Sequence, residues 1–324
     1  MTRRLRFFLL ALLALLLLSG GGAYWAWRTY QAAGPLDVSK AVVIPPRSST
    51  QDIAERLREQ GVTSVNDTGF AAAAWLTRRQ GPLRAGEYQF PAHASVAATL
   101  DVLRTAKPVQ RLLTIPEGLS AEQITALLQA APGLTGDAPV LEEAQILPDT
   151  YAYEWGDTRA SVVQRGTRAL RQFLAEAWDK RQDGLPFTTP RDALVLASIV
   201  ERETGRPDER AHVAGVFIGR LRLGMPLQSD PTVAYASNNG KALDRALTRA
   251  DLERDHPFNT YRNRGLPPGP IAAPGRDAIQ AVLHPAQTDD LYFVANGEGG
   301  HSFARTLDEH NRNVQRWRAR LQPR

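Results

Sequence analysis

Two glutamates end an otherwise apolar stretch, residues 194–205, which reads LVLASIVERETG. On a helix, side chains two residues apart point about 200° away from each other. Glu201 shares the face of Leu194 and Ala197, so we expect it to point to the interior and Glu203 to point to solvent. Burial disfavours the charged form of a carboxyl group, which predicts a raised pKa for Glu201. Such a group can act as the general acid that breaks a glycosidic bond.

A second interpretation of Glu201 is an ion pair with a nearby arginine, because 35 of the 39 basic residues are arginine. Helix position alone does not decide between the two. Two polar loops downstream favour the acid, since saccharide clefts combine short polar side chains with aromatic faces. These loops, residues 224–235 and 259–271, supply the candidate substrate contacts Gln228, Ser229, Asp230, Thr232, Asn259, Tyr261, Gly265 and Leu266.

A histidine-rich segment near the C-terminal end raises the question of a metal. His301, Asp308, Glu309 and His310 lie close in the sequence, but no HExxH or comparable ligand spacing occurs. Glu309 has another use, as the capping partner of Thr306 at the start of a helix. We therefore expect His301 to be a structural or substrate-contact residue, and we predict no metal and no cofactor.

Local signals define the elements that must position these residues. Thr189 caps a helix whose first residue is Pro190, and Gly205 suits the left-handed position that closes it. A second apolar helix is expected over 213–223, a long loop over 224–275, and a hairpin around GEGG at 297–300. An amphipathic helix over 161–181 precedes them.

The N-terminal half contains an internal echo. IPPRSSTQDIAERL begins at Ile44 and IPEGLSAEQITALL at Ile115, and each predicts a strand, a turn and a helix capped by serine, with a further strand over 83–90. Two ordinary βα units would explain the pattern. Alternatively, the copies resemble the LysM module, which binds polymers of N-acetylglucosamine, and the resemblance is better for the first copy.

Composition limits the compartment and the partners. The formal charge of +5 suits nucleic acid, anionic lipid or an anionic wall polymer, and the absence of a basic stripe with interleaved aromatic residues makes nucleic acid the weakest of these. The chain contains no cysteine, which excludes disulfides, thiolate metal sites and cysteine catalysis.

The first thirty residues predict a membrane anchor. Three arginines precede an apolar run over 7–27, which as a helix is roughly 30 Å long and can span a bilayer. Positive charge before the span places the N-terminus in the cytoplasm and the body outside it, with Tyr24, Trp25 and Trp27 at the far interface. The alternative is a signal peptide cleaved near residues 19–23. In either case the body works outside the cytoplasm, where nucleotide-driven chemistry is disfavoured.

Five motifs in this order resemble the YceG-like family: ILPDTY, LASIVERETG, LGMPLQSDPTVAY, NTYRNRGLPPGPI and LYFVANGEGGHSFARTLDEHN. The resemblance covers about residues 40–318. It implies a membrane enzyme facing the periplasm that cleaves nascent peptidoglycan strands internally, with Glu201 as the catalytic glutamate and the loop motifs lining the cleft. Four residues, Gly219, His256, Ala273 and Ala304, depart from the family pattern, which puts substrate contacts in doubt and not the chemistry.

The resemblance also implies a mechanism with one carboxyl group. That group protonates the oxygen between N-acetylmuramic acid and N-acetylglucosamine, and its carboxylate then takes a proton from the muramyl 6-hydroxyl, which closes a 1,6-anhydro ring. Asp230 is the rival second carboxylate. At about 5 to 9.5 Å from Glu201 it would make hydrolysis by a muramidase plausible.

The sequence thus predicts an α+β chain with four parts: a cytoplasmic tip and transmembrane anchor (1–30), a linker (31–41), a LysM-like subdomain (42–108) and a mixed α+β catalytic domain (109–324). We expect an endolytic lytic transglycosylase in the inner membrane with its body in the periplasm. Its expected partners are peptidoglycan strands, the membrane and possible synthases or division proteins, with no nucleic acid. A noncatalytic wall-binding scaffold is the rival from another class.

Overall fold

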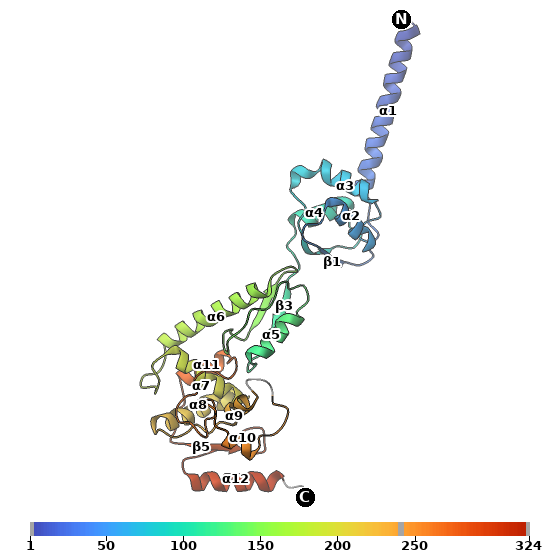
Figure 1. Ribbon diagram of the computed structural model, residues 1–324. Coiled ribbons are helices and arrows are strands. Elements are labelled where there is room, and N and C mark those ends of the chain that lie inside the picture. Colours follow the sequence, from blue (N-terminus) through green and yellow to red (C-terminus); the bar gives the residue numbers. More distant parts are fainter. Residues whose placement is uncertain (1–2, 239–242, 322–324) are drawn as a thin grey trace. The chain divides into compact units, whose positions relative to one another are not determined.

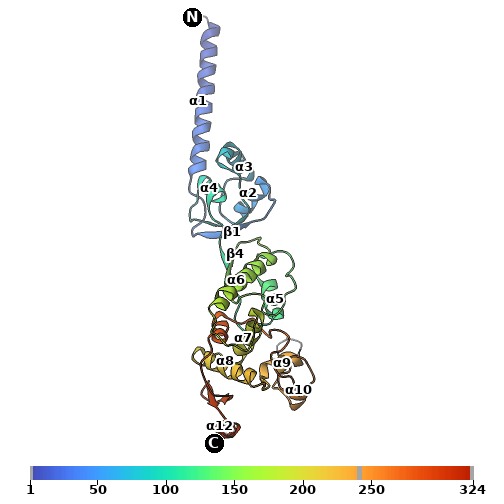
Figure 2. The ribbon, with the colours of Figure 1, turned by 90° about the vertical axis from the view of Figure 1, so that its left-hand side faces the viewer.

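The structure is a computed structural model that describes residues 3–238 and 243–321. It is a mixed α+β fold in which helices predominate and short strands form two-stranded sheets. The chain divides into two compact units (Figures 1 and 2). The first comprises Met1–Arg111 with Tyr153–Asp157, and the second comprises Leu112–Ala152 with Thr158–Arg324. The expected transmembrane helix is present as a candidate, and the expected α+β class is confirmed.

The first unit begins with the long helix α1 (Arg3–Gln31), in which Arg6–Gln31 is long and apolar enough to cross a membrane, with a mean hydropathy of 2.1. The strands β1 and β2 pair antiparallel, from Lys40 opposite Phe90 to Ile44 opposite Gly86. Helices cover them around a core that includes Leu57. The elements after α1 are β1 (Lys40–Ile44), α2 (Thr50–Glu59), α3 (Asp67–Leu76), η1 (Arg78–Gln80), β2 (Gly86–Phe90) and α4 (Val96–Thr105).

The second unit is mostly helical, with antiparallel pairing of β5 and β6 and a separate pair of β3 and β4. Its elements are β3 (Arg111–Thr114), α5 (Ala121–Ala130), β4 (Thr150–Tyr153), α6 (Arg159–Asp179), α7 (Pro190–Glu203), α8 (Pro207–Arg222), α9 (Asp230–Ser237), α10 (Arg249–Glu253), α11 (Arg276–Leu283), β5 (Tyr292–Ala295), β6 (His301–Ala304) and α12 (Leu307–Leu321).

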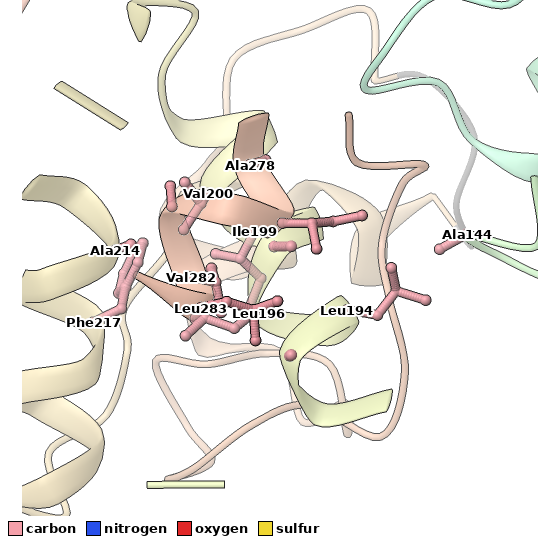
Figure 3. Packing of buried hydrophobic residues seen from close by; sticks show 14 of the residues in the cluster. Ala144, Leu194, Leu196, Ile199, Val200, Ala214, Phe217, Ala278, Val282 and Leu283 are labelled. Carbon is pink, nitrogen blue, oxygen red and sulfur yellow. The ribbon is translucent and has the colours of Figure 1, made fainter. Parts of the chain in front are cut away.

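Helix α7 is the centre of the second unit. Every residue from Ala193 to Val200 is buried, so the helix is enclosed on all sides, as expected for a helix that is apolar all round. Figure 3 shows Leu196, Ile199 and Val200 of α7 packed among Phe217 of α8 and Val282 of α11. Because the helix lies in the core, whatever its last turn presents is held rigidly.

The capping signals in the sequence are confirmed. Ser49, Ser120 and Thr189 each accept a hydrogen bond from the backbone of the third helical residue, and the side chain of that residue bonds back to complete a capping box. Thr306 and Glu309 make the same exchange at α12. The hairpin around 297–300 is present as β5 and β6.

Two expectations about elements are wrong. Helix α7 ends at Thr204 in an extended conformation (φ −137°, ψ 128°), so Gly205 does not close it in the left-handed region. The stretch 224–275 is mostly loop, as expected, but the short helices α9 and α10 within it were not predicted, and neither were α3, α4 and α11. Helix α8 begins at Pro207, well before residue 213, because Pro207 starts a helix whose first turn is polar.

Candidate active site

The last turn of α7 carries a carboxyl group in a polar cleft, and that group belongs to Glu203. Its Oε1 accepts a hydrogen bond of 2.5 Å from Ser229 Oγ. Glu203 is half-buried where it lines this cleft, and burial raises the pKa of its carboxyl group to about 7, with the charge of Asp230 adding to the effect and Ser229 and Arg220 opposing it. The group can therefore hold a proton at neutral pH.

The prediction that Glu203 points to solvent is met only in part, because the residue is half-buried in the cleft that it lines and burial raises its pKa. The helical wheel placed Glu201 and Glu203 on opposite faces of α7, but both faces of this helix are covered by protein. The apolar run 193–200, interrupted only by Ser198, is the signal in the sequence that could have shown this, because only an enclosed helix is apolar on nearly every side.

The cleft that Glu203 lines has a volume of about 450 Å³ and lies wholly within the second unit. Four of the predicted substrate-contact residues line it together: Gln228, Asp230, Tyr261 and His301. Segments from three parts of the sequence thus meet around one carboxyl group. Polar groups with aromatic faces in one cleft are the arrangement that saccharide binding requires.

Backbone geometry and hydrogen bonds fix one wall of the cleft. Gln228 is in the left-handed region (φ 49°), which is uncommon for a residue other than glycine, and its N–H donates to Thr260 O at 3.1 Å. Tyr261 Oη donates to Asp230 Oδ1 at 2.7 Å. Burial, followed by this bond, raises the pKa of Tyr261, so its hydroxyl remains a hydrogen-bond donor. Strain at a cleft residue is typical of a functional site.

The opposite wall includes His301, which α8 holds in place. Glu209 Oε2 lies 2.8 Å from His301 Nδ1, and Glu209 Oε1 accepts from the His301 backbone N–H at 3.0 Å. Gly300 makes this approach possible, because a Cβ atom there would lie 2.4 Å from Glu209 Oε1. The double contact fixes the imidazole ring of His301 where it lines the cleft.

Sequence reasoning missed the residues that complete the cleft. Arg220 is buried beside Tyr292, with its guanidinium 5.2 Å from the ring centre, and donates to Leu227 O and Leu291 O. His310 and Trp317 of α12 also line the cleft. No local motif marks Arg220 or Trp317. The only signal for Trp317 in the sequence is that it is an aromatic residue in a basic, amphipathic helix.

Glu201 occupies a different environment on the other side of α7. The expectation that it points inward with a raised pKa is confirmed: its side chain is 7% exposed, and burial is the main cause of the shift. However, its Oε2 accepts from Gly275 N–H at 2.8 Å, and its Oε1 lies 3.7 Å from Arg210 Nη2. The alternative interpretation, an ion pair with an arginine, is therefore also supported. Through Gly275, Glu201 connects the end of α7 to the N-cap of α11.

Three other predicted contact residues are too deeply buried to touch a polymer. Thr232 and Asn259 are fully enclosed, and Ser229 is 1% exposed. Asn259 Nδ2 donates to Leu252 O and Arg254 O, and its Oδ1 accepts from Tyr261 N–H. Thr232 Oγ1 donates to Ser229 O. These residues hold the loops in shape, which corrects the expectation of direct substrate contact.

The turn at residues 265–266 does not join the residues that line the cleft. Gly265 adopts a left-handed conformation (φ 80°), which explains the glycine, and Leu266 packs against the apolar core. Of the four departures from the family pattern, Ala273 and Ala304 are buried, and His256 Nδ1 accepts from Phe258 N–H. At Gly219, a Cβ atom would lie 3.3 Å from Leu291 Cδ2. None of the four lines the cleft.

Comparisons of the sequence with protein families and with curated proteins point to the same family. Residues 42–316 match the YceG-like family. The chain is 38% identical over 175 residues to a protein of Bacillus subtilis (strain 168) named endolytic murein transglycosylase, covering 54% of this chain and 48% of that protein. It is 29% identical to a protein of the same name from Streptococcus pneumoniae serotype 2, covering 94% of this chain and 63% of that protein. The chain therefore spans about half to two thirds of the length of these relatives.

A solved structure of a YceG-like protein is also similar to this chain. The 2.6 Å crystal structure of a YceG-like protein from Listeria monocytogenes superposes with a TM-score of 0.52 at 28% identity, covering 85% of this chain and 98% of that one. The family match extends over most of the chain, including parts of both compact units and all the residues that line the cleft except Trp317. The chain belongs to the YceG-like family.

Proposed function

We propose that this chain is an endolytic lytic transglycosylase of peptidoglycan and that Glu203 is its general acid. The observation that carries the proposal is a single carboxyl group with a pKa of about 7 in a cleft lined by Gln228, Asp230, Tyr261 and His301. A general acid works best when its pKa lies near the operating pH. The names of the Bacillus and Streptococcus relatives support the reaction class.

The proposed reaction has two proton transfers, and Glu203 makes both. Ser229 Oγ donates to Glu203 Oε1, so Oε2 is the oxygen that carries the proton. That proton passes to the oxygen between N-acetylmuramic acid and N-acetylglucosamine as the bond to the anomeric carbon breaks. The resulting carboxylate takes the proton of the muramyl 6-hydroxyl, whose oxygen bonds to the anomeric carbon and closes the 1,6-anhydro ring. Glu203 ends protonated, and no water is consumed.

Glu201 remains the competing candidate for this role. Its pKa is also raised by burial, but its two oxygens are engaged by Gly275 and Arg210. It is absent from the lining of the cleft that holds the polar residues. We infer that Glu201 stabilises the junction of α7 and α11, while Glu203 performs the chemistry.

The remaining parts of the proposal concern location. We place the chain in the cytoplasmic membrane through α1, with its N-terminus in the cytoplasm and its body outside. We assign a LysM-like, glycan-binding role to the subdomain over 42–108. Peptidoglycan strands are the substrate, and synthases or division proteins are candidate partners. The apolar, exposed character of α1 supports the anchor.

Two alternatives make different predictions. A muramidase needs a second carboxylate, and Asp230 faces the same cleft as Glu203. It would release reducing ends in place of anhydro ends. A noncatalytic scaffold would bind glycan without cutting it, yet it has no use for an acid held neutral in a cleft.

Mass spectrometry of the products tests these possibilities. The full chain in detergent would be incubated with purified uncrosslinked glycan strands, and the new ends would be identified. We expect 1,6-anhydro-muramyl ends within shortened strands. Reducing ends would establish a hydrolase and direct attention to Asp230. Intact strands that still bind the protein would overturn catalysis and favour the scaffold.

A further inference from the structure

An apolar groove in the first unit lies between the end of α1 and the helix α3. It has a volume of about 740 Å³ and is lined by Ala23, Trp27 and Tyr30 of α1 and by Val65, Ala73 and Leu76 of the α3 region. Both views of the first unit place α3 beside the point where α1 leaves it (Figures 1 and 2). The cleft of the second unit makes no use of this groove.

The end of α3 exposes large apolar side chains next to the groove. Trp75 is 61% exposed and Leu76 is 70% exposed, whereas Phe70 and Ala74 of the same helix are buried in the core of the unit. Arg78 places its guanidinium 4.1 Å from the centre of the Trp75 ring. Tryptophan, leucine and arginine side by side are typical of a protein surface that meets the interface of a phospholipid bilayer.

This surface is held rigidly. The buried Arg104 of α4 donates to Ala74 O, to Thr77 Oγ1 and to Gly81 O, which fixes the end of α3 and the turn that follows. The side chains of Trp75 and Leu76 are therefore presented by an ordered helix end. Because the helix end is fixed, Trp75 and Leu76 cannot turn away from water by local rearrangement of the backbone.

The junction between α1 and the rest of the unit is also fixed. Tyr30 packs against the core cluster, and the segment that follows is hydrogen-bonded to His93. Gly34 N–H donates to His93 O, and a Cβ atom at Gly34 would lie 2.2 Å from Ala94 O. The end of α1 is therefore fixed to the rest of the first unit.

The depth of α1 in a bilayer then places the groove. A hydrocarbon core of roughly 30 Å takes about 20 helical residues, so a span that starts after Arg6 ends near Ala26. The groove residues from Ala23 to Tyr30 lie at that boundary. Leu76 lines the same groove as these residues of α1, and the exposed Trp75, Arg78 and Arg79 are its neighbours in the sequence.

We propose that the C-terminal end of α3, residues 75–79, is a second membrane contact, in which Trp75 and Leu76 enter the outer leaflet and Arg78 and Arg79 bind phospholipid phosphates. A lipid acyl chain fills the groove beside α1. The inference rests on the proposed anchor role of α1 and is independent of the chemistry in the cleft. The contact would hold the first unit flat against the membrane.

Site-specific labelling tests the proposal, because the natural chain has no cysteine. Leu76→Cys, Trp27→Cys and Ala41→Cys would each be labelled with bimane in the full chain. Ala41 is exposed on β1, which lies at the end of the first unit away from α1, so it is the matched control (Figure 1). Each protein would be placed in vesicles of phosphatidylethanolamine and phosphatidylglycerol, with and without bromine on the acyl chains.

We expect brominated lipid to remove most of the fluorescence at positions 27 and 76 and little at position 41. Adding Arg78→Glu and Arg79→Glu to the Leu76→Cys chain should restore fluorescence at position 76. Quenching at 27 without quenching at 76 would overturn the second contact and leave the anchor intact. Absence of quenching at both would overturn the anchor and the second contact together. Shielding of position 76 from a water-soluble quencher, without quenching by lipid, would assign the surface to a protein partner and also overturn the proposal.

Discussion

At the scale of the residue, the neutral form of Glu203 is the feature on which the proposed chemistry depends. Its surroundings favour the protonated group, since burial outweighs the stabilisation of the charged form by Ser229 and Arg220. The two glutamates at the end of α7 also show what a sequence can and cannot predict. Helical spacing gives the angle between Glu201 and Glu203, but which protein segments cover each face depends on contacts with distant residues. The apolar run 193–200 implied that both faces were covered.

The raised pKa of Glu203 predicts a pH-dependent gain in stability when the charge is removed. A raised folded-state pKa means that the contribution of Glu203 to stability is fully present below its unfolded pKa of about 4.5 and is lost as pH rises through about 7. Glu203→Gln should therefore be more stable than the natural chain at pH values above about 7, by at most about 3 kcal/mol, since one pKa unit corresponds to about 1.4 kcal/mol. The difference should shrink towards acid pH.

Urea unfolding in mildly acid and mildly alkaline buffer measures this difference. Gln removes the charge and keeps nearly the same shape, and Ser229 can still donate to its amide oxygen. A stability difference between the variant and the natural chain that is the same at both pH values, or a variant less stable than the natural chain in alkaline buffer, would show that Glu203 is not held neutral by the fold.

At the scale of the element, local motifs predicted helix starts well, and contacts between distant segments limited the rest. The capping boxes at Ser49, Ser120 and Thr189 depend on residues three apart, so they could be identified in the sequence. Helices α9 and α11 span only eight residues each, too short for an apolar period to be clear, and they are stabilised by packing on α7.

Asn259 is predicted to stabilise the second polar loop and not to bind substrate. It joins its own loop to α10 through hydrogen bonds to Leu252 and Arg254 and accepts from Tyr261. Asn259→Ala should lower the stability of the second unit by about 2–4 kcal/mol, because it leaves buried backbone groups without partners. Thermal unfolding measures the change. Unchanged stability with weakened glycan binding would instead restore the original expectation of a substrate contact.

The hairpin of β5 and β6 depends on α8 for the position of His301. We predict that Glu209→Ala lowers cleavage about tenfold or more, because it removes two hydrogen bonds made by one charged group, each contributing about 1.5–3 kcal/mol. The loss should fall mainly on KM, since His301 lines the cleft and is not the acid.

Asp208→Ala is the matched control for Glu209. Asp208 lies one residue away on the same turn of α8, is exposed, and forms an ion pair with Arg206. Its removal should leave cleavage unchanged. Equal losses in the two variants, or a fall in the unfolding temperature that matches the loss of activity in Glu209→Ala, would indicate a structural role in place of positioning.

At the scale of the whole molecule, the cleft gathers residues that lie up to 114 positions apart, from Glu203 to Trp317. Polar loops could be recognised in the sequence because they concentrate amides and hydroxyls in short stretches. Arg220 and Trp317 could not, because each is a single residue on a helix whose partner in the cleft is set only by the fold. The family resemblance supplied the order of the motifs and not their geometry.

The anchor is predicted to restrict which strands are cut. A tether confines the active site to glycan near the membrane, so new strands should be preferred, an effect of local concentration. Replacing α1 by a soluble leader should broaden cleavage to older wall material in cells pulse-labelled with a radioactive wall precursor. The age of the strands that carry new ends measures this. An unchanged preference for new strands would show that the second unit or a partner makes the selection.

The most direct test of the account compares initial rates of glycan cleavage by the natural chain, Glu203→Gln and Glu201→Gln across neutral pH. We predict that the rate of the natural chain falls as pH rises through about 7, as the acid loses its proton. Glu203→Gln should lose cleavage by at least about 100-fold, the usual contribution of a general acid, while remaining folded and able to bind glycan. Glu201→Gln should retain most of its activity per folded molecule. The opposite result, an active Glu203→Gln and a folded but inactive Glu201→Gln, would contradict the assignment and move the chemistry to Glu201.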